Sequence, residues 1–161
     1  MQPNFHSVLL WGFAATLVLT TTMSASQGLR LTRMSIPVML GTMLSANLDR
    51  APIYGFGLHL LNGWVFSTLY ALAFEAWNQA TWWMGPVLGL LHGLFVLVAL
   101  MPVLPSIHPR MASEHRQPEP TALLEPPGFL ALNYGVRTPV STLVAHVLYG
   151  LVLGLFYRLA P

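Results

Sequence analysis

The sequence predicts an all-α membrane protein, a single domain in which four transmembrane helices form a bundle from two tandem helical hairpins. Composition is the first observation that predicts it. Of 161 residues, 55% are hydrophobic and only 7% are charged, whereas a soluble domain carries about 25% charged residues. So few charges cannot cover a water-facing surface, so the exterior suits lipid. The second observation is a repeated apolar stretch, long enough in each copy to cross a bilayer.

The repeat relates residues 50–73 to residues 137–160. Aligned without a gap, the two stretches share the pattern R-x-P-x6-H-x3-G-x6-Y-x2-A. The matched pairs are Arg50 and Arg137, Pro52 and Pro139, His59 and His146, Gly63 and Gly150, Tyr70 and Tyr157, and Ala73 and Ala160. Because the matched positions cover several different residue types in the same register, they indicate an internal duplication. Each copy would be the second helix of a hairpin, and the hairpins would be related by an axis along the membrane normal.

The predicted spans cover about residues 6–27, 52–74, 82–104 and 138–159. The first also resembles a secretory signal peptide, but no Arg or Lys precedes it and the duplication needs a first helix, so we expect it to be retained. Trp77, Trp82 and Trp83 fit an aromatic belt near the connection between spans two and three. That connection is short enough to predict a tight hairpin. We expect Pro102 and Pro105 to end the third span.

Two loops, residues 30–49 and 105–136, lie on one side of the membrane in this topology. The loops and their boundaries hold every arginine except Arg158. Because basic residues favour the cytoplasmic side, we predict cytoplasmic loops anchored by Arg50 and Arg137, and both termini in the periplasm.

The first loop contains a short apolar piece broken by Pro37 and Gly41. It is too short to span, so we predict an interfacial or re-entrant segment. Its methionines, Met34, Met39 and Met43, are either adaptable packing residues or soft copper ligands.

Three histidines lie inside the predicted spans, where an ionisable side chain is costly and marks a functional site by default. His59 and His146 each follow the proline of their repeat by seven residues. At ~1.5 Å per residue, both lie roughly 10 Å into their helices. His92 enters from the other side to about 15 Å, so we expect the three rings to converge in one layer. In the second loop, His108 and His115 are expected to be solvated.

Helical spacing places small and aromatic residues on the same faces as these histidines. They are Gly63, Tyr70, Gly89, Gly150 and Tyr157. One interpretation is tight helix packing, with each histidine hydrogen bonded across an interface. Another is a metal or proton site at His59, His92 and His146, because imidazole binds metals and titrates near neutral pH. A third is a b-type haem between His59 and His146. No carboxylate lies at this depth to complete a zinc site.

The remaining composition narrows the function. The absence of cysteine excludes disulfides and thiolate chemistry. A net charge of +2 from scattered arginines argues against nucleic acid. Without a nucleophile–base pair, phosphate loop or carboxylate dyad, the sequence favours a non-catalytic role.

Two functions remain open. The leading prediction is a membrane protein that binds or passes a small cation at the three histidines. The alternative is a scaffold or assembly factor that docks a partner through its glycine-rich faces and residues 105–136. Besides lipid, the expected partners are a second copy or another membrane protein.

Four segments, GLLHGL, LPSIHPR, GFLALNYGVRTP and AHVLYGLVLGLFY, together resemble those of a family of small bacterial integral membrane proteins with no assigned activity. The resemblance covers most of the chain from the second span onward. It implies a compact helical bundle, expected in the bacterial inner membrane, and implies no activity or ligand.

Overall fold

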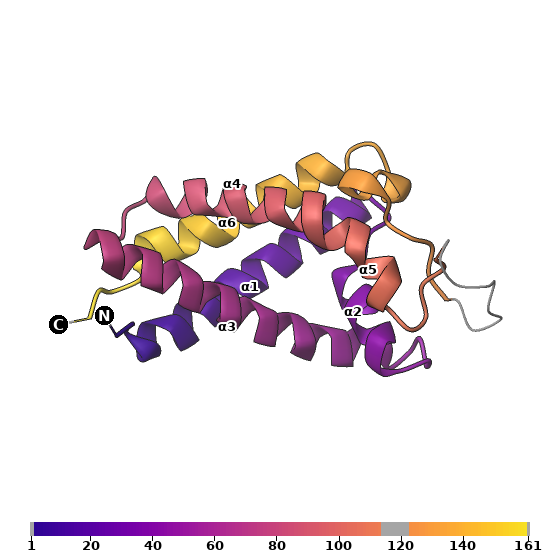
Figure 1. The fold of residues 1–161 in the computed structure, drawn as a ribbon, viewed down its shortest axis with the longest axis horizontal. Coiled ribbons are helices and arrows are strands. Elements are labelled where there is room, and N and C mark those ends of the chain that lie inside the picture. Colours follow the sequence, from indigo (N-terminus) through magenta and orange to yellow (C-terminus); the bar gives the residue numbers. More distant parts are fainter. Residues whose placement is uncertain (1, 114–122, 161) are drawn as a thin grey trace.

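The computed structural model describes residues 2–113 and 123–160, and every regular element within them is a helix (Figure 1). The all-α prediction is therefore confirmed. The elements are α1 (Phe5–Gly28), α2 (Ile36–Leu44), α3 (Ala51–Trp77), α4 (Met84–Phe95), the π-helical segment η1 (Val96–Leu100), α5 (Met101–Ile107), the 3-10 segment η2 (Phe129–Tyr134) and α6 (Thr138–Phe156). His115 and Arg116, which were assigned to the second loop, lie outside the described residues.

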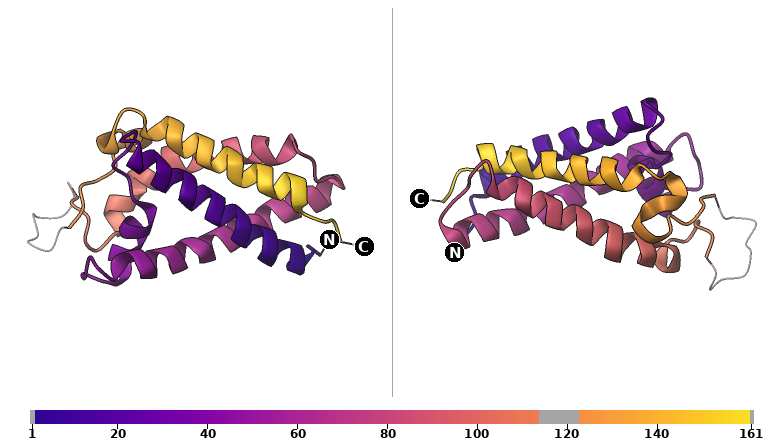
Figure 2. Two further views of the ribbon diagram at one scale, coloured as in Figure 1. Left: turned by 180° about the vertical axis from the view of Figure 1, so that it is seen from behind. Right: turned by 90° about the horizontal axis from the view of Figure 1, so that it is seen from above.

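Both chain termini lie at one end of the elongated bundle, which we call the terminal end (Figures 1 and 2). There the Glu75 carboxylate at the end of α3 accepts hydrogen bonds from the Tyr157 hydroxyl (2.7 Å) and the Ala160 amide (2.8 Å). The Tyr157 hydroxyl also accepts a hydrogen bond from the Asn4 amide (2.9 Å). These bonds fasten the end of α3 to both ends of the chain.

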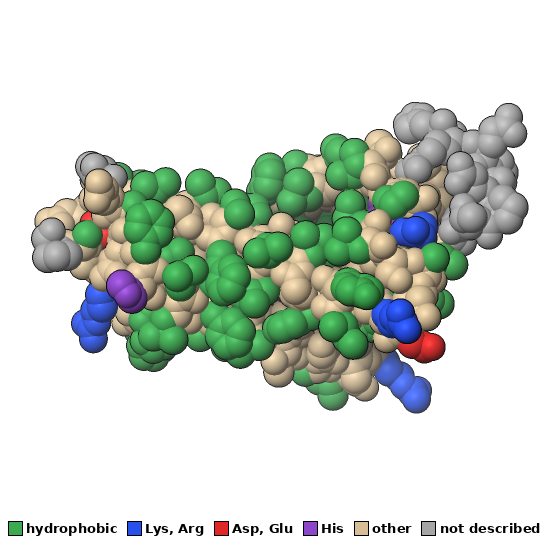
Figure 3. All heavy atoms as spheres, turned by 90° about the horizontal axis from the view of Figure 1, so that it is seen from below, with side chains coloured by type: hydrophobic (Ala, Val, Ile, Leu, Met, Phe, Trp, Pro, Cys, Tyr) green, Lys and Arg blue, Asp and Glu red, His purple; other side chains and the backbone are tan. Residues whose placement is uncertain are grey.

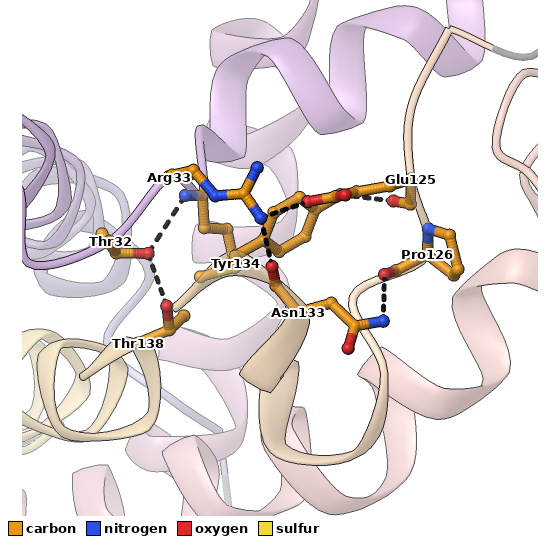
Figure 4. Close-up of polar contacts among 8 residues, drawn as sticks. Thr32, Arg33, Glu125, Pro126, Asn133, Tyr134 and Thr138 are labelled. Carbon is orange, nitrogen blue, oxygen red and sulfur yellow. Dashed lines mark hydrogen bonds and ion pairs between the residues drawn. The ribbon is translucent and has the colours of Figure 1, made fainter. Parts of the chain in front are cut away.

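The opposite end, which we call the loop end, joins the segment after α1 to the segments before α6 (Figure 4). The Thr32 and Thr138 hydroxyls are hydrogen bonded at 2.7 Å and both residues are buried. Arg33 forms an ion pair with Glu125 (2.7 Å). The Tyr134 hydroxyl donates to the Glu125 carbonyl oxygen (2.8 Å). The first and second loops are therefore held together.

The threonine pair at the loop end should matter more for stability than the ion pair beside it. We expect Thr138→Val to lower the free energy of unfolding by about 1 kcal/mol, because the buried Thr32 hydroxyl loses a partner. Glu125→Gln breaks an ion pair whose side chains are 68% and 46% exposed, so we expect a loss well under ~1 kcal/mol. Thermal unfolding of the two variants in detergent measures the difference, and a larger effect of Glu125→Gln would contradict this ranking.

Three helices are long and apolar enough to cross a membrane by length and composition: Phe5–Gly28, the continuous helix Met84–Ile107, and Thr138–Phe156. The sequence predicted four. The 27-residue α3 is not among the three, because polar residues such as His59 and Asn62 lower its hydropathy. On the face that Figure 3 shows, hydrophobic side chains nevertheless cover the middle and charged ones gather at the two ends.

The third of the predicted spans does not end at its prolines. The helix continues through Pro102 and Pro105 to Ile107, so that prediction is wrong. In η1 the hydrogen bonds shift register, and the Met101 amide donates to the Val96 carbonyl oxygen, five residues back. The wider turn comes just before Pro102, which lies in the first turn of α5. A residue without an N–H is tolerated there.

The closely packed helix pairs are α4 with α6, α2 with α3, and α1 with both α3 and α6. The two predicted hairpins, α1 with α3 and α4 with α6, are therefore both in contact. In contrast, α3 and α4 diverge from their short connection (Figure 1), so the tight hairpin predicted there does not form. Ring contacts of Phe66 and Tyr70 with His92 connect the two helices across the space between them.

Glycines bring α4 and α6 into backbone contact. A Cβ atom at Gly85 would overlap the Gly150 carbonyl oxygen, and one at Gly89 would overlap the His146 carbonyl oxygen. Small residues permit this close approach of helices. The glycine faces predicted to dock a partner are thus occupied within the chain itself.

Candidate functional site

The three predicted histidines line one cavity of about 110 Å³ near the middle of the bundle. The structure therefore brings His59, His92 and His146 together, from α3, α4 and α6. Residues of α1, α2, η1 and α5 complete the walls, so the cavity lies where seven helical segments converge. The other lining residues are Thr16, Leu19, Met34, Ile36, Met39, Leu40, Asn62, Gly63, Phe66, Val96, Leu100, Met101, Thr142 and Tyr149.

His146 is held by its own helix and is 5% exposed. Its Nδ1 lies 2.8 Å from the Thr142 carbonyl oxygen. A carbonyl oxygen can only accept, so Nδ1 carries the proton and Nε2 is the acceptor nitrogen of the neutral ring. The ring meets His92 edge to face, with centroids 4.6 Å apart and an interplanar angle of 81°. The two imidazoles are therefore direct neighbours.

His92 is fixed by aromatic side chains of α3 and α6. Its ring stacks on Phe66 with centroids 3.8 Å apart. Its Nδ1 lies 3.4 Å from the Tyr70 hydroxyl, and the edge of Tyr149 approaches with centroids 5.9 Å apart. Such contacts orient the ring while leaving part of it on the cavity.

Two buried polar atoms in the cavity wall have no hydrogen-bond partner within the described chain. They are Nε2 of His59 and Oγ1 of Thr142, and both atoms are buried. Each such group costs about 1–3 kcal/mol when left unpaired, so water or a bound species is expected to satisfy it. A single water needs roughly 10–15 Å³ of such space. The cavity has room for several.

Of the small and aromatic residues predicted to share helix faces with the histidines, some lie at the cavity and others lie elsewhere in the bundle. Tyr70 contacts the cluster through His92, and Gly63 lines the cavity, where its carbonyl oxygen accepts a hydrogen bond from the Tyr149 hydroxyl (2.6 Å). Gly89 and Gly150 lie instead in the contact between α4 and α6.

Tyr157 does not match Tyr70, its partner in the sequence repeat. α6 ends at Phe156 whereas α3 continues to Trp77, so Tyr157 leaves the helix and binds Glu75 at the terminal end. The assignment of Tyr157 to the histidine face is wrong for this reason.

The starts of the two repeat helices do coincide. Arg50 and Arg137 each immediately precede the first helical residue of α3 and α6, and a proline follows in the first turn of both. Both arginines therefore lie at the loop end, at equivalent positions of their helices. The duplication itself stays a prediction.

Sequence reasoning missed Asn62, Thr142 and Tyr149. Each lies three or four residues from a predicted histidine, on the same helical face. That spacing was the signal that would have found them. The loop histidine His108 is also not solvated as predicted, because its side chain is fully buried against α2.

The cavity does not fit the metal-cluster and haem interpretations. Within residues 2–113 and 123–160, no group of three or more His, Asp or Glu side chains is arranged to hold a metal ion. Pockets for larger organic ligands measure about 300–1,000 Å³, well above the 110 Å³ found. One face of His92 is also covered by Phe66. The cavity therefore has no space for a haem between these histidines.

Fold and cavity together define the class: an all-α protein with several apolar helices, compatible with a membrane protein, around a small buried cavity rich in histidine. Compared with protein-family models, with curated proteins and with solved structures, the chain has no match.

Proposed function

We propose that this chain is a four-span membrane protein whose buried histidine cluster binds and passes a small cation, the proton. The observation that carries this proposal is the cavity itself. Three imidazoles face one space in which two polar atoms, on His59 and Thr142, lack partners.

The path of the chain supports α3 as the fourth span. α1 ends at the loop end and α4 begins at the terminal end (Figure 1). If both helices cross a membrane, the chain between them must cross it as well. With 27 residues α3 is about 40 Å long, which exceeds a hydrocarbon core of ~30 Å. Its polar residues His59 and Asn62 line the cavity, where polar side chains are tolerated.

The distribution of arginines supports an orientation. Arg30, Arg33, Arg50, Arg110 and Arg137 lie in the segments of the loop end, whereas Arg158 lies at the terminal end. The positive-inside rule then favours a cytoplasmic loop end and periplasmic termini, as in a bacterial inner membrane. A reporter fused to the C-terminus that is active only in the periplasm tests this orientation.

The proton fits the geometry better than a metal ion. Imidazole gains and loses a proton close to neutral pH, and the direct contact of His92 with His146 allows a proton to be shared or relayed. Waters in the cavity would connect these rings with His59. A metal ion, in contrast, requires several ligands already arranged around one point, and the described residues form no such group.

Proton passage is measured with the purified chain in liposomes that contain a pH-sensitive dye, under an imposed potassium diffusion potential. We expect wild-type protein to acidify the lumen, and His92→Phe to reduce the rate to that of protein-free liposomes. The matched control is His6→Ala, which removes an exposed histidine at the terminal end and should leave the rate unchanged. A wild-type rate equal to that of empty liposomes would contradict the proposal.

A further inference from the structure

Thr142 behaves differently from other buried threonines of the bundle. The hydroxyls of Thr16 and Thr42 each donate to the carbonyl oxygen four residues earlier (2.7 and 2.8 Å), as threonines in apolar helices usually do. Thr142 is 1% exposed, yet its Oγ1 has no hydrogen-bond partner in the described chain. Its hydroxyl therefore has a hydrogen-bonding capacity that no described residue uses, in a residue that lines the cavity.

A second free group lines the same space. Nε2 of His59 is buried without a partner, and Nε2 of His146 is the acceptor nitrogen of its ring. The walls thus offer a hydroxyl, which both donates and accepts, beside imidazole nitrogens. Hydroxyl and carbonyl groups are complementary to this set. No Asp, Glu, Lys or Arg lines the cavity, so a permanently charged head group would have no counter-ion.

The cavity reaches the lipid-facing surface between α3 and η1. Asn62 and Leu100 line it and are also exposed, Leu100 by 41%. Asn62 lies eleven residues after the start of α3, or about 16 Å along the helix, far from either end. An amide facing hydrocarbon is costly unless it is hydrogen bonded. No described residue hydrogen bonds to the Asn62 side chain. The opening of the cavity, which we call the mouth, therefore carries an unpaired amide at membrane depth.

The rest of the wall is apolar. Leu19, Met39, Phe66 and Val96 surround the polar groups. The volume of about 110 Å³ accommodates a head group with a few carbon atoms. A longer body would have to leave through the mouth, past Asn62, into the surrounding lipid.

We propose that this cavity binds, from the side, the uncharged hydroxyl or carbonyl head of a membrane-dissolved molecule whose apolar body stays in the bilayer. The inference rests on the proposed function in one respect, that α3 and the other helices span the membrane. It adds a ligand class to the histidine cavity.

The test uses photo-crosslinking of the full chain in phosphatidylcholine liposomes. The probes are a C16 alcohol with a diazirine near the hydroxyl and the C16 alkane with the diazirine at the same position. We expect the alcohol to label cavity residues such as Phe66 and Val96, in competition with hexadecanol, and the alkane to label outward-facing residues only. Thr142→Val keeps the side-chain shape and should reduce cavity labelling about three- to ten-fold, as expected for one lost hydrogen bond.

The matched control is Thr22→Val, whose exposed hydroxyl is bonded to its own helix and whose loss should not change labelling. Circular dichroism confirms that both variants fold. Equal cavity labelling by alcohol and alkane, or unchanged labelling of Thr142→Val, would overturn the inference.

Proton flux in the same liposomes without probe separates the two proposals. Flux without alcohol labelling defeats the ligand alone, and labelling without flux defeats proton passage alone.

Discussion

Gly55→Ala is expected to lower the free energy of unfolding by about 3 kcal/mol, the upper part of the usual range for overpacking. A Cβ atom at this position would overlap the Pro37 carbonyl oxygen and approach the Gly41 amide nitrogen at 2.6 Å. Both are backbone atoms of α2, which no side-chain rotation can move aside. In detergent the loss should appear as a fall in Tm of roughly 6–12 °C.

The same helix offers a matched control. At Gly57, two residues further on, an added Cβ meets nothing within 4 Å. Gly57→Ala should therefore keep or raise stability, by up to about 1 kcal/mol, because alanine favours the helix. If Gly55→Ala were as harmless as Gly57→Ala, the close crossing of α2 and α3 would be wrong. The crossing matters for the cavity, because α2 supplies Ile36, Met39 and Leu40 to its wall.

The histidines could be placed from sequence because depth and helical face follow from counting residues. His59 and His146 lie seven residues after prolines that begin their helices, and His92 approaches from the opposite end, so convergence in one layer was predictable. The residues that surround these histidines were harder to predict from the sequence. Whether Thr142 bonds its own helix or faces a cavity depends on packing between helices, which spacing alone does not encode.

The ends of elements were the least predictable feature. Tyr157 falls outside α6 although its repeat partner Tyr70 lies well inside α3, because a shared sequence pattern does not fix where a helix ends. Pro102 and Pro105 both lie inside the continuous helix of residues 84–107, and the π-helical turn of η1 comes just before Pro102. Where a helix ends and where it takes a π-helical turn both depend on local packing. The sequence around Tyr157 and around the two prolines does not indicate either feature.

His108 is the position where sequence and structure differ with the largest consequence for stability. Polar loop composition suggested a solvated side chain, yet His108 is 0% exposed. Its Nε2 donates to the Met39 carbonyl oxygen (2.9 Å) of α2, and its Nδ1 accepts from the Arg110 amide (3.1 Å). The Arg110 guanidinium in turn donates to the Thr42 carbonyl oxygen (2.8 Å) near the end of α2. These contacts hold α2 over the cavity.

We therefore expect His108→Ala to lower the free energy of unfolding by about 3 kcal/mol, since it removes buried hydrogen bonds and leaves a void in a packed region. His108→Gln retains a donor at a similar reach and should lose less. His6→Ala, at an exposed histidine, should change stability by no more than about 0.5 kcal/mol. Thermal unfolding of the three variants in one detergent ranks them. An effect of His108→Ala no larger than that of His6→Ala would contradict this prediction. It would show that the hydrogen bonds from His108 do not hold α2 against the cavity.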